Sequence, residues 1–84
     1  MRLIWSENSW QEYEKWQSTD KKILKKINTL IKDIKRDPFD GIGKPEPLKY
    51  ELAGCWSRRI TNEHRLVYMI EDDNISIISC QYHY

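Results

Sequence analysis

Apolar side chains recur with a helical period through part of the first half of the chain. The clearest stripe has spacings of four, three, one and three residues, at Ile23, Ile27, Leu30, Ile31 and Ile34. This spacing places all of them on one face of a helix, so an amphipathic helix is predicted from about residue 21 onward. Pro38 disfavours helical geometry at the preceding residue, and the helix should therefore end near Arg36.

An earlier strand and helix are predicted before this stripe. Residues 3–5 form a short apolar run with strand character. Three aromatic residues between positions 10 and 16 then follow at helical spacing. Either Ser6 or Ser9 can cap this helix, and Ser9 with a glutamate three residues later has the form of a capping box. A break at residues 18–20 supplies the N-cap of the next helix.

In the second half of the chain the apolar period changes to two. Glycines and prolines between residues 41 and 47 first predict an irregular loop. The alternation after it predicts strands at residues 48–51, 56–60, 65–71 and 75–82, with turns at 61–64 and 72–74. The expected fold is α+β: an N-terminal strand, two helices, then a four-strand antiparallel meander packed on the helices, forming a single domain of residues 1–84.

Composition narrows the class of protein. A chain of 84 residues supports one small core, and four Trp and five Tyr provide large side chains for it. Cys55 and Cys80 show no CxxC spacing, and no histidine lies at ligand spacing from them, so we expect neither a disulfide nor a metal site. No apolar run approaches the roughly 20 residues of a membrane span, and no signal peptide opens the chain. We therefore expect a cytoplasmic protein without membrane contact or cofactor.

The net charge of +1 conceals one strongly basic segment. Between residues 21 and 36, seven basic side chains accompany a single acidic one, Asp33; they are Lys21, Lys22, Lys25, Lys26, Lys32, Lys35 and Arg36. Lysine and arginine release counterions when they bind phosphates, so the segment favours a polyanion as partner. A solvated helix face accounts for the same pattern about equally well.

A glutamate framed by two prolines is the first candidate for chemistry. Glu46 lies between Pro45 and Pro47. Because both prolines fix their φ angles, they hold the backbone around Glu46, and a rigidly placed carboxylate suits general-base work. A solvated loop glutamate is the ordinary alternative.

Three arginines on two neighbouring predicted strands are the second candidate. Side chains alternate across a strand, so Arg58 and Arg59 face opposite ways. Arg59 and Arg65 flank the turn and are expected to converge on one phosphate, whose oxygens match the guanidinium fork. Edge protection by charge is the alternative. His64 is expected to face solvent, with no role beyond phosphate contact.

The C-terminal residues Gln81-Tyr82-His83-Tyr84 are the third candidate. A terminus normally frays, but two aromatics around a histidine indicate a docked end. Histidine is suited to donating a proton near neutrality, and tyrosine rings stack on unpaired bases. A hydrophobic plug is the alternative.

A constrained glutamate, clustered cations and a histidine together match cleavage of RNA by its own 2′-hydroxyl, which needs a base, charge stabilisation and an acid.

The chain resembles the YoeB toxins of the RelE superfamily along essentially its whole length. The segments that carry the likeness are residues 3–6, 43–49 (GKPEPLK), 56–60 (WSRRI), 64–68 (HRLVY) and 82–84 (YHY). The resemblance implies a RelE-like, microbial-ribonuclease-like fold and cleavage of mRNA in the A site of the 70S ribosome without a metal ion. It implies the general base at Glu46, the general acid at His83, transition-state stabilisation by Arg65, phosphate binding by Lys49 and Arg59, and completion of the site by Tyr84.

The resemblance also implies partners. These are a YefM-like antitoxin that neutralises the toxin, a second copy of the chain in a homodimer, and operator DNA only in complex with the antitoxin. The lysine-rich segment is expected to grip ribosomal RNA. Two other functions stay open from the residues alone: a binding module that clamps RNA or an acidic peptide without cutting, and a DNA-binding corepressor that requires its partner.

Overall fold

The computed structural model describes residues 1–82. Within this range the chain forms two helices, one 3₁₀ turn and a five-stranded sheet. The elements in chain order are β1 (Arg2–Trp5), α1 (Glu7–Thr19), α2 (Lys21–Arg36), β2 (Glu46–Pro47), η1 (Tyr50–Leu52), β3 (Trp56–Arg59), β4 (Arg65–Glu71) and β5 (Asn74–Ser79). None of the helices in this part of the chain is long and apolar enough to cross a membrane.

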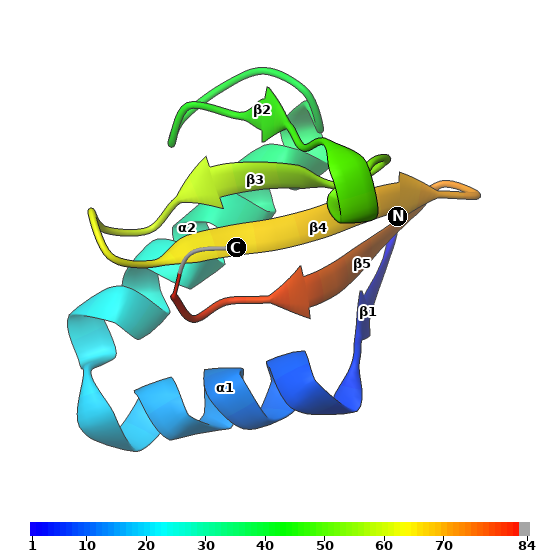
Figure 1. Ribbon diagram of the computed structural model, residues 1–84. Coiled ribbons are helices and arrows are strands. Elements are labelled where there is room, and N and C mark those ends of the chain that lie inside the picture. The colour runs from blue at the N-terminus through cyan, green and yellow to red at the C-terminus, as the bar shows by residue number, and fades with distance from the viewer. Residues whose placement is uncertain (83–84) are drawn as a thin grey trace.

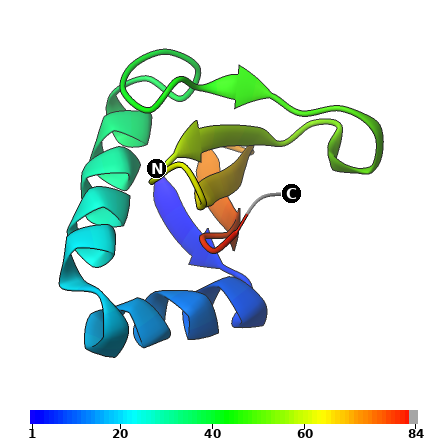
Figure 2. The same cartoon turned by 60° about the vertical axis from the view of Figure 1, so that its left-hand side comes forward.

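The strands lie side by side in the order β1-β5-β4-β3-β2 (Figure 1). The pairs from β2 to β5 are antiparallel, whereas β1 runs parallel to β5. Helices α1 and α2 lie on one side of the sheet and η1 on the other (Figure 2). The predicted α+β order of strand, two helices and antiparallel strands is confirmed, and β1 adds a fifth strand at the edge of the same sheet.

Helix α2 forms as the apolar stripe predicts. The Asp20 side chain caps its start by accepting hydrogen bonds from the backbone N–H groups of Lys22 at 3.0 Å and Ile23 at 3.2 Å. The helix ends at Arg36, before Pro38. Its buried residues are four members of the predicted stripe: Ile27, Leu30, Ile31 and Ile34.

Of the two predicted N-caps of α1, Ser6 is confirmed, and the capping box at Ser9 is wrong. Ser6 is the N-cap, and its hydroxyl accepts a hydrogen bond from the Ser9 N–H at 3.0 Å. Ser9 lies inside the helix, fully buried, where its hydroxyl donates to the carbonyl of Ile77 at 2.8 Å. The carboxylate of Glu12, the other member of the expected box, accepts instead from the N–H of Cys80 at 2.8 Å. Both side chains therefore join α1 to β5 and the segment after it.

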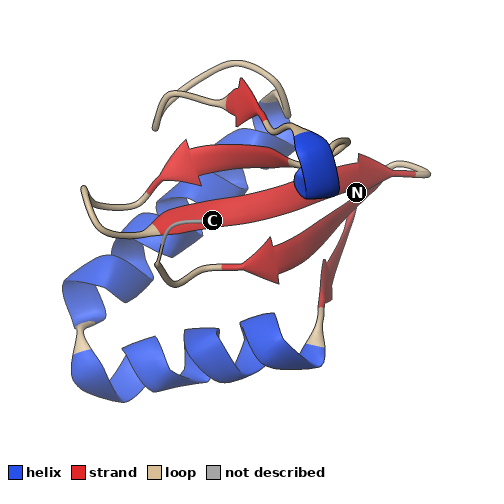
Figure 3. Cartoon of the chain, in the orientation of Figure 1, coloured by secondary structure: helices blue, strands red, loops and turns tan. Residues whose placement is uncertain are grey.

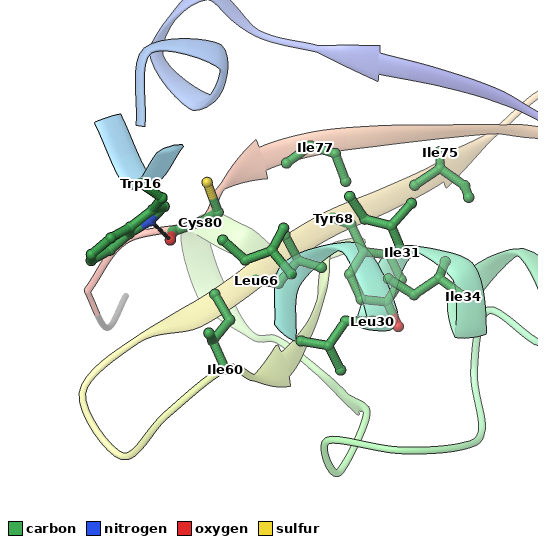
Figure 4. Packing of buried hydrophobic residues seen from close by; sticks show 11 residues of the cluster. Trp16, Leu30, Ile31, Ile34, Ile60, Leu66, Tyr68, Ile75, Ile77 and Cys80 are labelled. Carbon is green, nitrogen blue, oxygen red and sulfur yellow. Dashed lines mark hydrogen bonds between the residues drawn. The ribbon is translucent and has the colours of Figure 1, made fainter. Parts of the chain in front are cut away.

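The main core lies between the two helices and the sheet. Tyr68, with no exposed surface, stands at its centre on β4 and donates through its hydroxyl to the carbonyl of Pro38 at 2.6 Å. Figure 4 shows side chains from α1, α2 and the strands around it. The buried members are Trp16, Ile27, Leu30, Ile31, Ile34, Ile60, Leu66, Tyr68, Ile75, Ile77 and Cys80.

The opposite face of the sheet carries a smaller apolar cluster and no long helix among the described residues. Leu48, Cys55 and Val67 form this cluster, with Leu52 packed against it. The 3₁₀ turn η1 lies in front of the strands on this face (Figure 3). The strand predicted at residues 48–51 is therefore wrong: the chain turns there, because the turn brings Leu52 back over the cluster instead of letting it extend away.

The last strand is also shorter than predicted. It ends at Ser79 rather than at residue 82. The Cys80 N–H is held by Glu12, and the Trp16 indole donates to the Cys80 carbonyl at 3.0 Å. Both backbone groups of Cys80 are thus bound by α1, so the residue cannot continue the ladder with β4.

Candidate functional site

Strand register brings several of the candidate residues to one face of the sheet. Glu46 on β2 pairs with Ser57 on β3, and Arg59 on β3 pairs with Arg65 on β4. Cross-strand partners point to the same side, and Ser57 and Arg59 are two residues apart, so they share a face. All four side chains therefore lie on the face opposite α2. From strand spacings of about 4.8 Å and about 3.3 Å per residue, the Glu46 and Arg65 backbones are roughly 12 Å apart.

Glu46 is exposed at the sheet edge, on a short and well-anchored strand. The residue after Pro47 is Leu48, whose side chain is buried and whose N–H donates to the Cys55 carbonyl at 2.9 Å. The backbone before β2 is also held, since the Arg59 N–H donates to the Gly43 carbonyl at 2.7 Å. These bonds, with the prolines on either side, fix the backbone from which the Glu46 carboxylate projects.

Arg65 is held rigidly while keeping its charge. The residue is only 9% exposed, and its Nη1 donates to the carbonyl oxygens of Thr61, Asn62 and His64 at 2.6, 3.2 and 3.1 Å. Carbonyl oxygens satisfy the donors of a guanidinium without neutralising it. The positive charge of Arg65 is therefore fixed in place on this face, beside the exposed Arg59.

Lys49 and Tyr50 extend the candidate site beyond Glu46. Both are exposed, and residues 46–50 line a surface pocket of about 280 Å³. Tyr50 is 92% exposed and has a φ of 59°, which is uncommon for a residue with a large side chain. Sequence reasoning missed Tyr50 because it placed the residue in a regular strand; only the turn at η1 presents it to solvent.

Arg58 does not belong to this face, although the sequence groups it with the other arginines. It has no exposed surface and points toward α2, where its guanidinium forms an ion pair with Asp33. It also donates to Tyr68 Oη at 3.2 Å and to the carbonyl of Asp37 at 2.7 Å. Hydrogen bonds from Arg36 and then Arg58 hold the pKa of Asp33 well below its usual range. Arg58 is a structural residue that ties β3 to the loop after α2.

His64 is not the solvent-facing residue that its turn position suggested, and that prediction is wrong. It is 6% exposed, and its ring packs edge-on against Trp16 with centroids 4.9 Å apart. Its Nδ1 accepts a hydrogen bond from the N–H of Tyr82 at 2.7 Å. The period of two contained the signal, since position 64 alternates with Leu66 and Tyr68 on the core side of the sheet.

The structure describes the C-terminal candidate residues as far as Tyr82. The Tyr82 carbonyl accepts from the Arg65 N–H at 3.1 Å, so the chain after β5 returns to the start of β4. Figure 1 shows this return as the red segment that follows β5. His83 and Tyr84 lie outside the described residues, and their predicted roles as acid and as completion of the site stay predictions.

No metal centre is formed by the residues in the range 1–82. They contain no group of three or more His, Cys, Asp or Glu side chains placed to hold an ion. Cys80 is buried between α1 and β5, and burial, with a smaller effect of Glu12, raises its pKa to about 12. Burial also raises the pKa of Cys55. Both thiols therefore stay protonated near neutrality and are poor ligands and nucleophiles.

The fold is that of a known class of small bacterial proteins. The family model described as "YoeB-like toxin of bacterial type II toxin-antitoxin system" matches residues 5–84. The toxin YoeB of Escherichia coli strain K12 is 66% identical over 84 residues, which is the full length of both chains. The chain therefore belongs to the YoeB-like toxins of type II toxin–antitoxin systems.

Solved structures agree with this assignment. The YoeB/ParE toxin from Agrobacterium tumefaciens superposes with a TM-score of 0.98 at 52% identity, covering all of both chains. YoeB from Staphylococcus aureus, solved as a YoeB–YefM complex and as a YoeB dimer, gives a TM-score of 0.93 in each, at 48% and 49% identity, over 100% of this chain and 98% of that one. A toxin–antitoxin complex, RelBE2 from Mycobacterium tuberculosis, is 24% identical with a TM-score of 0.72 over 98% of this chain and 96% of that one. This last likeness concerns the fold alone and confirms its RelE-like character.

Proposed function

We propose that the chain is a ribosome-dependent endoribonuclease that cuts mRNA in the A site of the 70S ribosome and so inhibits translation. The observation that carries the proposal is the strand register, which puts Glu46, Arg59 and Arg65 on one face of the sheet. Cleavage of a phosphodiester needs a base for the attacking hydroxyl and positive charge beside the phosphate oxygens. A carboxylate at one side of a pair of guanidiniums supplies both. Membership of the YoeB-like toxins supports the same conclusion.

The reaction is internal attack by the ribose 2′-hydroxyl. Glu46 accepts the 2′-OH proton as the oxygen attacks phosphorus, and Arg65 stabilises the negative charge that develops on the phosphorane oxygens. Arg59 and Lys49 bind the phosphate and its neighbour. His83 donates a proton to the departing 5′-oxygen, and Tyr84 completes the site beside it. The bond to the 5′-oxygen breaks, leaving a 2′,3′-cyclic phosphate, or the 3′-phosphate formed from it by water, and a 5′-hydroxyl.

The residues suit these roles physically. Among the described residues, three carbonyls bind Nη1 of Arg65 and fix the direction in which its guanidinium points, so that Nε and Nη2 can be offered to a phosphate. Donors that are already oriented need no reorganisation when negative charge develops in the transition state. Electrostatic stabilisation of this kind is usually the largest single contribution to catalysis. One base, one acid and fixed cations are sufficient for the chemistry, so we propose that it proceeds without a metal ion.

The proposed partners follow from the relatives. YoeB of Staphylococcus aureus forms a complex with YefM and a dimer of its own. We propose that this chain binds a YefM-like antitoxin that suppresses cleavage, forms a homodimer, and reaches operator DNA only within the antitoxin complex. Size-exclusion chromatography with light scattering of the chain alone and with its antitoxin tests both assemblies: a monomer, or no complex with the antitoxin, contradicts the corresponding partner.

The experiment that tests the function is cleavage of a programmed mRNA on purified ribosomes. Glu46→Gln and His83→Gln should each lower the rate by roughly 10²–10⁴-fold, the usual contribution of a general acid or base. Glu51→Gln is the matched control, because Glu51 is an exposed glutamate on η1 outside the proposed site, and it should leave the rate unchanged. Full activity of Glu46→Gln, or protection of the RNA without new 5′-hydroxyl ends, refutes the proposal and favours a binding module.

A further inference from the structure

A two-point contact holds the chain directly before its last two residues. The Tyr82 N–H donates to Nδ1 of His64 at 2.7 Å, and the Tyr82 carbonyl accepts from the N–H of Arg65 at 3.1 Å. Both backbone groups of Tyr82 are therefore bound by two consecutive residues at the start of β4. We propose that His64 is a positioning residue that docks the C-terminal segment through Tyr82, the residue directly before His83 in the chain. This inference rests on the proposed function, in which His83 is the proton donor.

The imidazole of His64 is held by contacts other than the one to Tyr82. Its backbone carbonyl accepts from the N–H groups of Ile60 at 3.0 Å and Thr61 at 3.2 Å, and its own N–H donates to the Thr61 hydroxyl at 3.1 Å. The ring is buried against Trp16 and lies 5.3 Å from the ring of Tyr82. A ring held from the backbone and from its faces presents Nδ1 in one direction.

A second anchor lies two residues earlier and acts on the same segment. Cys80 is held at its N–H by Glu12 and at its carbonyl by the indole of Trp16, a bond that Figure 4 marks. Trp16 therefore contacts both the Cys80 anchor and the His64 ring. The segment is pinned at residues 80 and 82, and only Gln81 lies between the two fixed points.

The conformation of Tyr82 needs such anchoring. Its φ is 61°, in the left-handed region that bulky side chains rarely occupy. Residues keep unfavourable backbone angles where the surroundings over-determine them, and such residues gather at functional sites. A free chain end would relax to a negative φ, so the two hydrogen bonds to Tyr82 are what maintain the angle.

The hydrogen-bond chemistry assigns one tautomer to His64. Because the Tyr82 N–H is a donor, Nδ1 must offer its lone pair, and the ring proton belongs on Nε2. The Glu63 carboxylate lies 3.3 Å from Nε2. Tyr82 is bonded directly to His83, the proposed acid. The placement of a catalytic group has a large effect on rate, since misplacement by about 1 Å can cost about 100-fold.

Two amide variants test the role of Nδ1. In His64→Asn the side-chain oxygen can occupy the place of Nδ1 and accept from Tyr82, whereas in His64→Gln the amide reaches the place of Nε2. We expect His64→Gln to lower kcat on ribosomes about 10–100-fold with KM little changed, and His64→Asn to recover most of the rate. Equal losses in both variants, or a loss in KM alone, would identify His64 as a packing residue and overturn the inference.

Two readouts do not depend on cleavage. The Tyr82 amide, followed by ¹H–¹⁵N NMR, should exchange with solvent at least about 10-fold faster in His64→Gln than in wild type or His64→Asn, while amides of β4 keep their protection. Unchanged protection of Tyr82 in His64→Gln overturns the inference. In the wild-type protein at pH 8, the imidazole nitrogen shifts should report the Nε2–H tautomer of His64; the Nδ1–H tautomer would overturn it even if neither variant folds. A wild type that docks Tyr82 but cuts no RNA refutes the proposed function and leaves the docking established.

Discussion

Arg58 and Arg59 show how a single step along a strand decides the role of a residue. They are adjacent and chemically identical, yet Arg58 is fully buried against Asp33 and Arg59 is exposed on the opposite face. The alternation of side chains across a strand accounts for the difference. The buried guanidinium satisfies carbonyl and carboxylate groups of the loop after α2, whereas the exposed one remains available to a ligand.

Matched substitutions should separate these two roles. Arg58→Met removes the buried donor to Asp33 and to several loop carbonyls, and we expect it to lower the free energy of unfolding by about 3 kcal/mol. Arg59→Met should change stability by less than about 0.5 kcal/mol while lowering RNA cleavage. Urea denaturation measures the first effect and the ribosome assay the second. Equal losses of stability would contradict the assignment of Arg58 to structure and Arg59 to the site.

Acid should destabilise the protein partly through Asp33. Its pKa is lowered in the folded state, so the unfolded chain binds a proton first as the pH falls. The stability that the ionised carboxylate contributes is therefore present above its ordinary pKa of 3.8 and is lost below it, as the pH falls toward the folded-state value. Asp33→Asn should be less stable at pH 7, and its thermal midpoint should fall less between pH 5 and pH 2 than that of wild type.

The control for this measurement is an exposed aspartate in the hairpin turn. Asp73 has a φ of 62°, which asparagine also tolerates, so Asp73→Asn should keep both the fold and the acid sensitivity of wild type. If Asp33→Asn followed the wild-type curve across the same pH range, the ion pairs of Asp33 with Arg36 and Arg58 would not be the source of the acid sensitivity.

Residue roles were predictable where periodicity alone decides them. The framing of Glu46 by prolines and the opposite orientations of Arg58 and Arg59 follow from local chemistry. The contact between His64 and Tyr82 does not, because it joins residues 18 apart through a backbone N–H that carries no sequence signature. The exposure of Tyr50 likewise depends on the turn at η1, where the alternation of apolar residues predicted a strand.

At the scale of elements, α2 combines a strong fold signal with a charge pattern that opposes it. Its apolar stripe is buried and its ends lie where Asp20 and Pro38 predict. The first turn, however, contains Lys21 and Lys22 and no acidic residue. The N-terminus of a helix carries a partial positive charge, so lysines there cost stability. Their presence at this end is explained if the helix meets a polyanion, which supports the proposed contact with ribosomal RNA.

Charge reversal at this end should therefore move stability and function in opposite directions. Lys21→Glu with Lys22→Glu should stabilise the fold by about 0.3–1 kcal/mol for each residue, by matching the helix dipole. The same variant, and more strongly the one that also reverses Lys25 and Lys26, should bind ribosomes less tightly and with weaker salt dependence, while cutting naked RNA as before. Thermal unfolding and ribosome sedimentation at several salt concentrations measure the two effects.

The matched control reverses two lysines at the other end of the same helix. Lys32→Glu with Lys35→Glu changes the net charge by the same amount but places acid near the negative end of the dipole, so this variant should lose stability. A parallel loss of ribosome-dependent and naked-RNA cleavage in the Lys21 and Lys22 variant would contradict the separation between an RNA-gripping helix and a cutting face.

Elements defined by regular periods were predicted well, and elements decided by distant contacts were not. The stripe of α2 and the strands β3 and β4 follow the expected ranges closely. The strand expected at residues 48–51 is a turn because Leu48 belongs to the small apolar cluster and Leu52 packs against the same cluster. The end of β5 is set by α1, which binds both backbone groups of Cys80. The parallel pairing of β1 with β5 also needed the structure, since nothing local specifies a partner strand.

For the whole molecule, the two faces of the sheet divide stability from chemistry. Helices α1 and α2 bury the main core on one face (Figure 2). Within residues 1–82, the other face has only the small cluster around Val67, and its polar residues include Glu46, Arg59 and Arg65. A sheet that gains its stability mainly from one side is free to carry charged groups on the other. The central claim is that this second face cuts RNA by means of the RNA's own 2′-hydroxyl.

Removing the 2′-oxygen from one nucleotide of the substrate gives the most direct test of this proposal. An mRNA with one 2′-deoxyribose on the 5′ side of the scissile phosphate lacks the proposed nucleophile but retains the phosphate, the bases and the ribosomal context. Under single-turnover conditions, internal attack by the 2′-hydroxyl predicts no cleavage at that bond. The unmodified mRNA should yield a 2′,3′-cyclic phosphate and a 5′-hydroxyl. Cleavage of the deoxy-substituted bond at the unmodified rate would contradict attack by the 2′-hydroxyl.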